Sequence, residues 1–316
     1  MRKNSARGKA SAATRSSTSA RRSTGDVATA LADHQHRPRQ DGLLPGGLAA
    51  YRQSEGPLAA DGRPFVEEAI EREAHALSQI AAAFAGRGDD IAAIIVEPIQ
   101  GEGGDNHFRP ELFQALRKIA DEREALLIFD EVQTGLGITG TMWAYEHFVE
   151  PDMIAFGKKM QVCGFFASRR LDEVPDNVFA CKSRINSTWG GDLTDMVRAT
   201  RILEVMAEES LCANAEAMGK RLLDGFQKLC QEFPEICENP RGRGLMCAFD
   251  VKDRAIRTAL LALTFEKGML VLPTGELGIR ARPSLVVKAE EIDLALSIFR
   301  DSLIALRGSL GPISAT

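Results

Sequence analysis

The sequence predicts an α/β fold in two parts, a partial large domain built on a mainly parallel sheet and a small α+β domain at the C-terminus. Two apolar runs, 91–96 and 126–129, flank an amphipathic stretch at 110–124. This strand–helix–strand order is typical of a right-handed crossover between parallel strands. Beyond about residue 205 long helical patterns alternate with isolated strands, which is typical of an α+β domain.

The elements of the first part begin near residue 66. Apolar residues recur at helical spacing over 66–85, and Gly86 follows as a C-terminal cap. The run 91–96 is apolar and largely β-branched, as in buried parallel strands. Further apolar runs at 153–156 and 164–168 continue the sheet. Residues 1–64 are rich in Ser, Arg, Ala and Gly without either period, so we expect a disordered head that is unrelated to the fold.

The second part follows two long helical stretches, 193–208 and 211–233, of which the first links the domains. We then expect a strand at 245–251, a helix at 255–267, strands at 270–273 and 279–282, and a closing helix at 292–306. The expected division is therefore a head at 1–64, part of a large domain at 65–205 and a small domain at 206–310.

Composition indicates a globular cytoplasmic enzyme. The 316 residues are 44% apolar and 26% charged, and no apolar run approaches the roughly 20 residues of a membrane-spanning helix. Seven of the 39 basic residues lie in residues 1–24, which have no acid, so the remainder has 32 basic and 44 acidic residues and is not expected to bind nucleic acid. The six cysteines have neither CxxC pairs nor metal-ligand spacing, which indicates reduced thiols and no metal site.

Two residues that follow predicted strands can carry chemistry. Asp130 follows the run 126–129, and Lys158 follows the run 153–156 and Gly157. In open α/β sheets the ligand lies beyond the carboxyl ends of the strands. There a lysine can form a Schiff base with a carbonyl, and an aspartate can keep a pyridinium nitrogen protonated. The pair predicts a pyridoxal 5′-phosphate (PLP) enzyme; the alternative is an exposed loop lysine and an aspartate that caps a strand.

Spaced strings of residues give the chain a family resemblance. The strings are Asp130-Glu131-Val132-Gln133-Thr134-Gly135, Pro151-Asp152, Gly157-Lys158 and Cys163-Gly164. Together they resemble the signature of class III aminotransferases, which are PLP enzymes of fold type I. Within that class the chain is most similar to the L-lysine 6-transaminases, through the strings 97–108, 157–164, 186–191 and 241–247. The resemblance covers about 64–306.

The resemblance implies a reaction and an assembly. The ε-amino group of L-lysine would pass to 2-oxoglutarate, with PLP as cofactor, in a homodimer. 4-Aminobutyrate or ornithine aminotransferase is the alternative within the class, because these enzymes share the same substrate logic. From a different class, the alternative is a catalytically dead fragment that binds a full-length partner or nothing.

The resemblance also implies roles in cofactor binding. Lys158 rather than Lys159 forms the Schiff base, because the lysine of the family follows directly on the glycine. Asp130 pairs with the ring nitrogen, and Val132 packs against the ring. Gln133 bonds the phenolic oxygen, with an exposed loop glutamine as the alternative.

Ser187 and Thr188 resemble the phosphate-contacting pair of the family, which reaches the cofactor of the neighbouring subunit. Asp192 stands where an asparagine is usual, and its charge would disfavour a nearby phosphate. The alternative for Asp192 is to cap the N-terminus of the helix that follows.

Arg280 resembles the arginine that binds the α-carboxylate of 2-oxoglutarate. A guanidinium suits this role because it can form two parallel hydrogen bonds with a carboxylate. Glu102 matches the glutamate that masks this arginine in one half-reaction and releases it in the other. Glu97 matches a structural or substrate-contacting glutamate. Arg282 is the nearby competitor of Arg280, and without the motif Glu102 would be a solvated loop acid.

The chain is expected to be an N-terminally truncated family member. A glycine-rich phosphate loop, a ring-stacking aromatic residue and a distal-carboxylate arginine belong upstream of Glu97, and residues 1–64 do not resemble that region. We therefore expect little transaminase activity from this chain alone. We also expect apolar surface to be exposed around Ile94, Leu127 and Ile154, with a tendency to aggregate.

Overall fold

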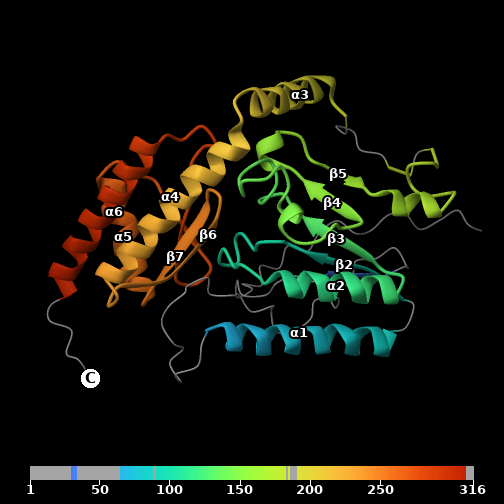
Figure 1. Cartoon of the computed structure of the whole chain (residues 1–316), viewed down its shortest axis with the longest axis horizontal. Helices are drawn as coiled ribbons and strands as arrows, with labels where there is room; N and C mark the ends of the chain where they lie inside the picture. Colours follow the sequence, from blue (N-terminus) through green and yellow to red (C-terminus); the bar gives the residue numbers. More distant parts are fainter. Residues whose placement is uncertain (1–29, 34–64, 88–89, 183, 186–190, 311–316) are drawn as a thin grey trace, which may run out of the picture.

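The structure, a computed structural model, describes residues 30–33, 65–87, 90–182, 184–185 and 191–310 (Figure 1). Two sheets organise these residues. The first has the order β1-β2-β3-β4-β5 and the second β6-β7-β9-β8. The predicted α/β architecture is confirmed, whereas the division at 64 and 205 stays a prediction.

The first sheet is parallel at its centre and antiparallel at both edges. Strands β2, β3 and β4 pair in parallel, and β1 and β5 pair antiparallel with β2 and β4. Its strands are β1 (Ala30–Asp33), β2 (Ile91–Val96), β3 (Leu126–Asp130), β4 (Met153–Phe156) and β5 (Gly164–Ala167). Strand β1 lies in the stretch for which no regular structure was expected, so the interpretation of 30–33 as irregular is wrong.

Helices α1 (Phe65–Arg87) and α2 (Pro110–Glu122) lie on one side of this sheet, with α2 between the sheet and α1 (Figure 1). Pro110 starts α2 at a position where its missing N–H has no helical partner. The apolar stripe of α2 covers the sheet, and Phe113 packs edge-on against Phe129 at 5.4 Å between ring centroids.

The expectation of exposed apolar surface around Ile94, Leu127 and Ile154 is wrong. Ile94, Leu127 and Ile154 are 0%, 0% and 3% exposed. Their registers place them on one face, and this is the face that α2 covers.

In the second unit, three helices pack against an antiparallel sheet. Its elements are α4 (Leu211–Glu232), β6 (Cys237–Arg243), β7 (Met246–Val251), α5 (Arg254–Glu266), β8 (Leu272–Thr274), β9 (Gly278–Ala281) and α6 (Ala289–Leu310). Phe226, Phe249 and Phe299 form an edge-on triad in its core, with centroids 5.0–5.5 Å apart. Strand β6 escaped prediction because Asn239, Pro240 and a bulge interrupt any alternation.

Helix α3 (Leu193–Glu208) leads from the first unit to α4 and stands away from the first sheet (Figure 1). Three short 3-10 helices complete the described chain: η3 (Ala144–His147), η4 (Lys158–Met160) and η5 (Arg169–Glu173). No helix in the described ranges is long and apolar enough to cross a membrane.

Candidate active site

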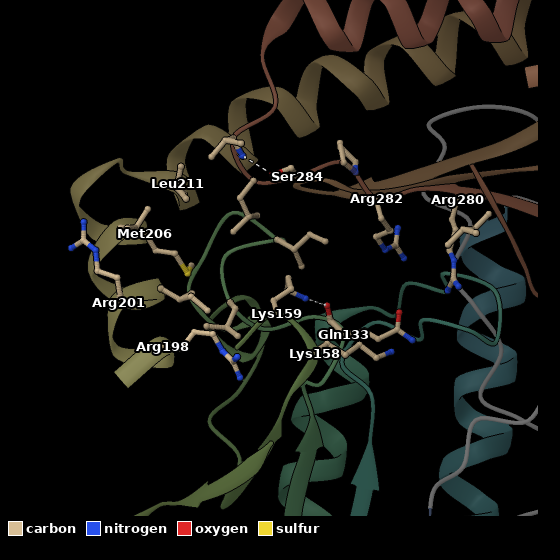
Figure 2. A pocket seen from close by; sticks show the side chains of 18 residues that line it. Gln133, Lys158, Lys159, Arg198, Arg201, Met206, Leu211, Arg280, Arg282 and Ser284 are labelled. Carbon is tan, nitrogen blue, oxygen red and sulfur yellow. Dashed lines mark hydrogen bonds between the residues drawn. The ribbon is translucent and has the colours of Figure 1, made fainter. Parts of the chain in front are cut away.

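The candidate site lies at the carboxyl ends of two neighbouring parallel strands. Asp130 ends β3, and Lys158 follows β4 after Gly157. The pairing of Asp130 with Ala155 aligns the two strand ends. A cavity of about 700 Å³ opens there, with Lys158, Gln133 and residues of the second unit in its wall (Figure 2).

The two adjacent lysines face different surroundings. Lys158 is exposed in the cavity and has a left-handed backbone, with φ of 47°. Lys159 donates from Nζ to the main-chain oxygen of Gln133 at 2.6 Å. Burial, helped by the charges of Arg282 and Lys158, lowers the pKa of Lys159 to about 8. In Figure 2, Lys158 extends toward the side where Arg280 lies, whereas Lys159 is directed at the main chain.

Asp130 is held in place by its own loop. Its Oδ1 accepts the N–H of Val132 at 3.1 Å. A Cβ on Gly157 would lie 3.6 Å from Cγ1 of Val132, so Val132 sits against the turn that carries Lys158. A Cβ on Gly101 would lie 2.5 Å from Cδ of Gln133, so the Gln133 side chain packs directly against the main chain of Gly101. The carboxyl ends of β3 and β4 therefore bring together four of the predicted residues, Asp130, Val132, Gln133 and Lys158.

Glu97 belongs to the same cluster. One of its carboxylate oxygens accepts the N–H of Gly101 at 2.9 Å. Burial raises the pKa of Glu97; the hydrogen bond from Gly101 opposes this rise, the charge of Asp130 adds to it and the charge of Lys158 opposes it. These charges act on Glu97 because the three side chains converge.

Glu102 and Arg280 form an ion pair across the two units. Oε2 of Glu102 lies 2.7 Å from Nη2 of Arg280, whose side chain is 11% exposed, whereas that of Glu102 is 71% exposed. Nε and Nη1 of Arg280 are buried and have no hydrogen-bond partner within the described residues. Two of the three guanidinium nitrogens are therefore without a partner among the described residues, and an exposed carboxylate pairs with the third.

Arg282 has a different partner. It pairs with the fully buried carboxylate of Asp105, and its Nη1 donates to the main-chain oxygen of Ala281 at 3.0 Å. Burial raises the pKa of Asp105, and Arg282 opposes the rise. Of the two competing arginines, only Arg280 pairs with Glu102.

Ser187 and Thr188 lie outside the described residues. Asp192 caps α3: its Oδ1 accepts the N–H groups of Thr194 and Asp195 at 2.9 and 3.2 Å. Of the two interpretations of Asp192, the helix cap is confirmed.

The sequence did not predict the residues whose side chains donate hydrogen bonds to the main chain of the Glu102 turn. Arg241, 2% exposed, donates to the main-chain oxygens of Gly104 and Asp105 at 2.6 and 3.0 Å. Thr274 donates to the main-chain oxygen of Gly101 at 2.9 Å. The signal for Arg241 was its place in the string 241–247, whereas Thr274 gave none.

The donor set fits PLP. An amine on an exposed lysine suits an aldehyde, a carboxylate at the neighbouring strand end suits a pyridinium nitrogen, and an amide suits a phenolic oxygen. Lys158, Asp130 and Gln133 supply these groups at one edge. Within the described ranges, no cluster of three or more His, Cys, Asp or Glu could hold a metal ion.

Comparisons with known proteins agree with this geometry. The chain matches the family aminotransferase class-III over residues 24–303. This match begins upstream of residue 64, where the resemblance was expected to begin. The L-lysine-epsilon aminotransferase of Mycobacterium tuberculosis is 56% identical over 232 residues, which are 73% of this chain and 52% of that protein. Human mitochondrial 4-aminobutyrate aminotransferase is 38% identical over 245 residues, 76% of this chain and 48% of that protein.

Among solved structures, lysine aminotransferase from M. tuberculosis in the internal aldimine form aligns with a TM-score of 0.75 and 51% identity, over 81% of this chain and 57% of that chain. The chain spans about half the length of the curated relatives it matches. The family match over most of the sequence and the shared fold lead to one conclusion: the chain belongs to the class III aminotransferases, PLP-dependent enzymes of fold type I.

Proposed function

We propose that the chain carries the machinery of a transaminase that moves the ε-amino group of L-lysine to 2-oxoglutarate. The observation that carries the proposal is the Glu102–Arg280 ion pair, whose arginine lines the same cavity as Lys158. An enzyme with a side-chain amine donor and a dicarboxylate acceptor has to offer one site to two differently charged substrates. An arginine with a removable carboxylate partner meets that need.

In this proposal Lys158 and Asp130 bind the cofactor and handle protons. PLP, when bound, supplies an aldehyde carbon for the amine and a ring that withdraws electrons. Lys158 would hold that aldehyde at rest, and its freed Nζ would carry a proton from the amine-bearing carbon of the substrate to the aldehyde carbon of the cofactor. Asp130 keeps the ring nitrogen protonated, Val132 packs on the ring, and Gln133 donates to the phenolic oxygen.

Substrate recognition falls to Arg280, Glu102 and Glu97. A two-point contact with a carboxylate uses Nη2 of Arg280 together with Nε or Nη1, which have no partner among the described residues, so the substrate has to displace Glu102 from Nη2. Glu102 leaves when the keto acid binds and returns when the amine donor binds, and Glu97 contacts the substrate. Ser187 and Thr188 are proposed to contact the cofactor phosphate.

The proposed donor is lysine because the curated relative with the higher identity carries that name. The alternative is 4-aminobutyrate or ornithine, because a relative that acts on 4-aminobutyrate by name matches over a similar span. All three donors are compatible with the Glu102–Arg280 pair.

We also propose a cytoplasmic homodimer. Large apolar side chains are exposed from β5 through η5 to α3, among them Phe165, Phe166, Phe179, Leu193 and Val197. An exposed apolar surface of this kind marks an interaction site in soluble proteins. Size-exclusion chromatography with light scattering tests the dimer.

A coupled glutamate assay with saturating PLP and 2-oxoglutarate tests the reaction. We expect lysine to support faster glutamate formation than 4-aminobutyrate or ornithine, and Arg280→Met to abolish it. A faster rate with either other donor would contradict the lysine assignment. Absence of turnover with every donor, although PLP binds, would favour the catalytically dead alternative.

A further inference from the structure

The turn that presents Glu102 is held from the second unit. Residues 100–106 form a tight loop closed by a bridge between Gln100 and Asn106. Within it, the main-chain oxygen of Gly101 accepts the N–H groups of Gly104 and Asp105 at 3.2 and 3.0 Å. Glu102 lies at the tip of this loop, and its side chain is largely exposed.

The hairpin of β8 and β9 donates hydrogen bonds to the main-chain oxygens of Gly101 and Glu102. Oγ1 of Thr274 donates to the oxygen of Gly101 at 2.9 Å, and the N–H of Gly275 donates to the oxygen of Glu102 at 3.1 Å. Thr274 is 2% exposed. A Cβ on Gly275 would lie 3.0 Å from Cα of Gly104, so the hairpin tip and the loop are in direct contact.

The same hairpin carries Arg280. In its register Thr274 pairs with Gly278, and Leu272 pairs with Arg280. One rigid element therefore fixes both the guanidinium and the main chain from which its carboxylate partner extends. Because the Glu102 side chain is 71% exposed, solvent weakens its attraction to Arg280, and the position of the main chain decides how often Glu102 covers Arg280.

We infer that Thr274 is a positioning residue, which holds the main chain at Glu102 so that its carboxylate covers Arg280. The inference rests on the proposed function, in which Glu102 competes with a substrate carboxylate for Arg280. Loss of the Thr274 hydroxyl frees the loop, lowers the fraction of time for which Glu102 covers Arg280, and makes this arginine more available to a dicarboxylate.

The variants are Thr274→Val, which removes the hydroxyl at nearly equal volume, and Thr274→Ser, which keeps it. Thr264→Val is the matched control, since Thr264 is also buried and its hydroxyl bonds a main-chain oxygen, that of Leu261, at 3.0 Å inside α5. Any effect of losing a buried threonine hydroxyl in general would therefore also occur in the control.

The first measurement is the affinity for glutarate, an unreactive dicarboxylate, by calorimetry on PLP-treated protein. We expect Thr274→Val to bind glutarate about twofold to fivefold more tightly, the effect of losing one hydrogen bond, and to show a higher KM for the amine donor. Thr274→Ser and Thr264→Val should match the wild type. The inference would be overturned if Thr274→Val changed neither the glutarate affinity nor the KM for the amine donor, or if it made both substrates bind more tightly or both more weakly to the same extent.

The second measurement is hydrogen exchange, which needs neither ligand nor turnover. In Thr274→Val, the amides of Gly104, Asp105 and Gly275 should exchange faster than in the wild type. In Thr264→Val they should exchange at the wild-type rate. Unchanged exchange in Thr274→Val would overturn the inference. If Arg280→Met binds glutarate as well as the wild type does, the proposed function fails, and the exchange result still decides whether Thr274 holds the turn.

Discussion

Oε2 of Glu102 lies 2.7 Å from Nη2 of Arg280, although 178 residues separate the two in the sequence. The pair joins the tip of a loop in the first unit to strand β9 of the second. It leaves the other two donors of the arginine without partners among the described residues. A carboxylate that is exposed over most of its surface thus covers part of an arginine that is almost buried.

Glu102→Gln is expected to raise the affinity for glutarate and to raise the KM for the amine donor. The amide competes for Arg280 less well than the carboxylate. We expect a change of about fivefold to tenfold, between the effect of an exposed ion pair and that of a buried charged hydrogen bond.

Glu276→Gln is the control for this prediction. Glu276 pairs with Arg254 at 2.8 Å, with both side chains exposed, near the tip of the same hairpin. This variant loses one surface charge without touching the site, so its glutarate affinity should equal that of the wild type. An equal rise in both variants would mean that net charge, and not the masking of Arg280, controls binding.

Borohydride reduction in the presence of PLP should attach a pyridoxyl group to Lys158. The reason is access: both lysines line the cavity, but Lys158 is exposed, whereas Lys159 is half-buried and its amine donates to the main-chain oxygen of Gln133. Peptide mapping by mass spectrometry identifies the labelled lysine. Lys158→Ala should lose the label and Lys159→Ala should keep it; the opposite pattern would reverse the assignment.

Lys159 should make stability depend on pH in the alkaline range. Its folded pKa of about 8 lies below the ordinary value of 10.5, so between these values the unfolded chain holds a proton that the folded chain has lost. Unfolding then takes up a proton, and the free energy of unfolding rises with pH across this window. Relative to Lys159→Met, the wild type should gain about 1–3 kcal/mol from pH 8 to 10.5 in urea titrations. A flat difference would contradict the lowered pKa.

Two helix glycines should respond in opposite ways to alanine. A Cβ on Gly219 in α4 would lie 2.0 Å from the main-chain oxygen of Gly244, and that backbone has no room to move because Gly244 itself abuts Ile138 and Thr139. We expect Gly219→Ala to lower the free energy of unfolding by about 2–4 kcal/mol. Gly308→Ala in α6 meets no atom within 4 Å and should raise stability by about 0.5–1 kcal/mol. Equal midpoints of thermal unfolding for the two variants would contradict the close approach of Gly219 to the main chain of Gly244.

The sequence alone predicted the elements whose patterns are local. The apolar, β-branched run of β2, the proline at the start of α2 and the spacing from Asp130 to Lys158 are each readable over a short window, because period and capping depend on near neighbours. The resemblance added the identity of Glu102 and Arg280 as partners, because the strings around them are specific. Strand β6 was not predicted, because its hydrogen bonds are set by its pairing with β7 and no local pattern marks it.

Tertiary structure decided what depends on distant contacts. Whether Ile94, Leu127 and Ile154 were covered depended on where α2 packs. The partner of Arg282 depended on the fold, which places its guanidinium beside the buried carboxylate of Asp105 while Arg280 reaches Glu102. The role of Thr274 depended on a hydrogen bond across 173 residues. A sequence pattern carries no record of such a bond, because a buried hydroxyl has the same local signal whether it bonds its own helix, as Thr264 does, or a loop of another unit.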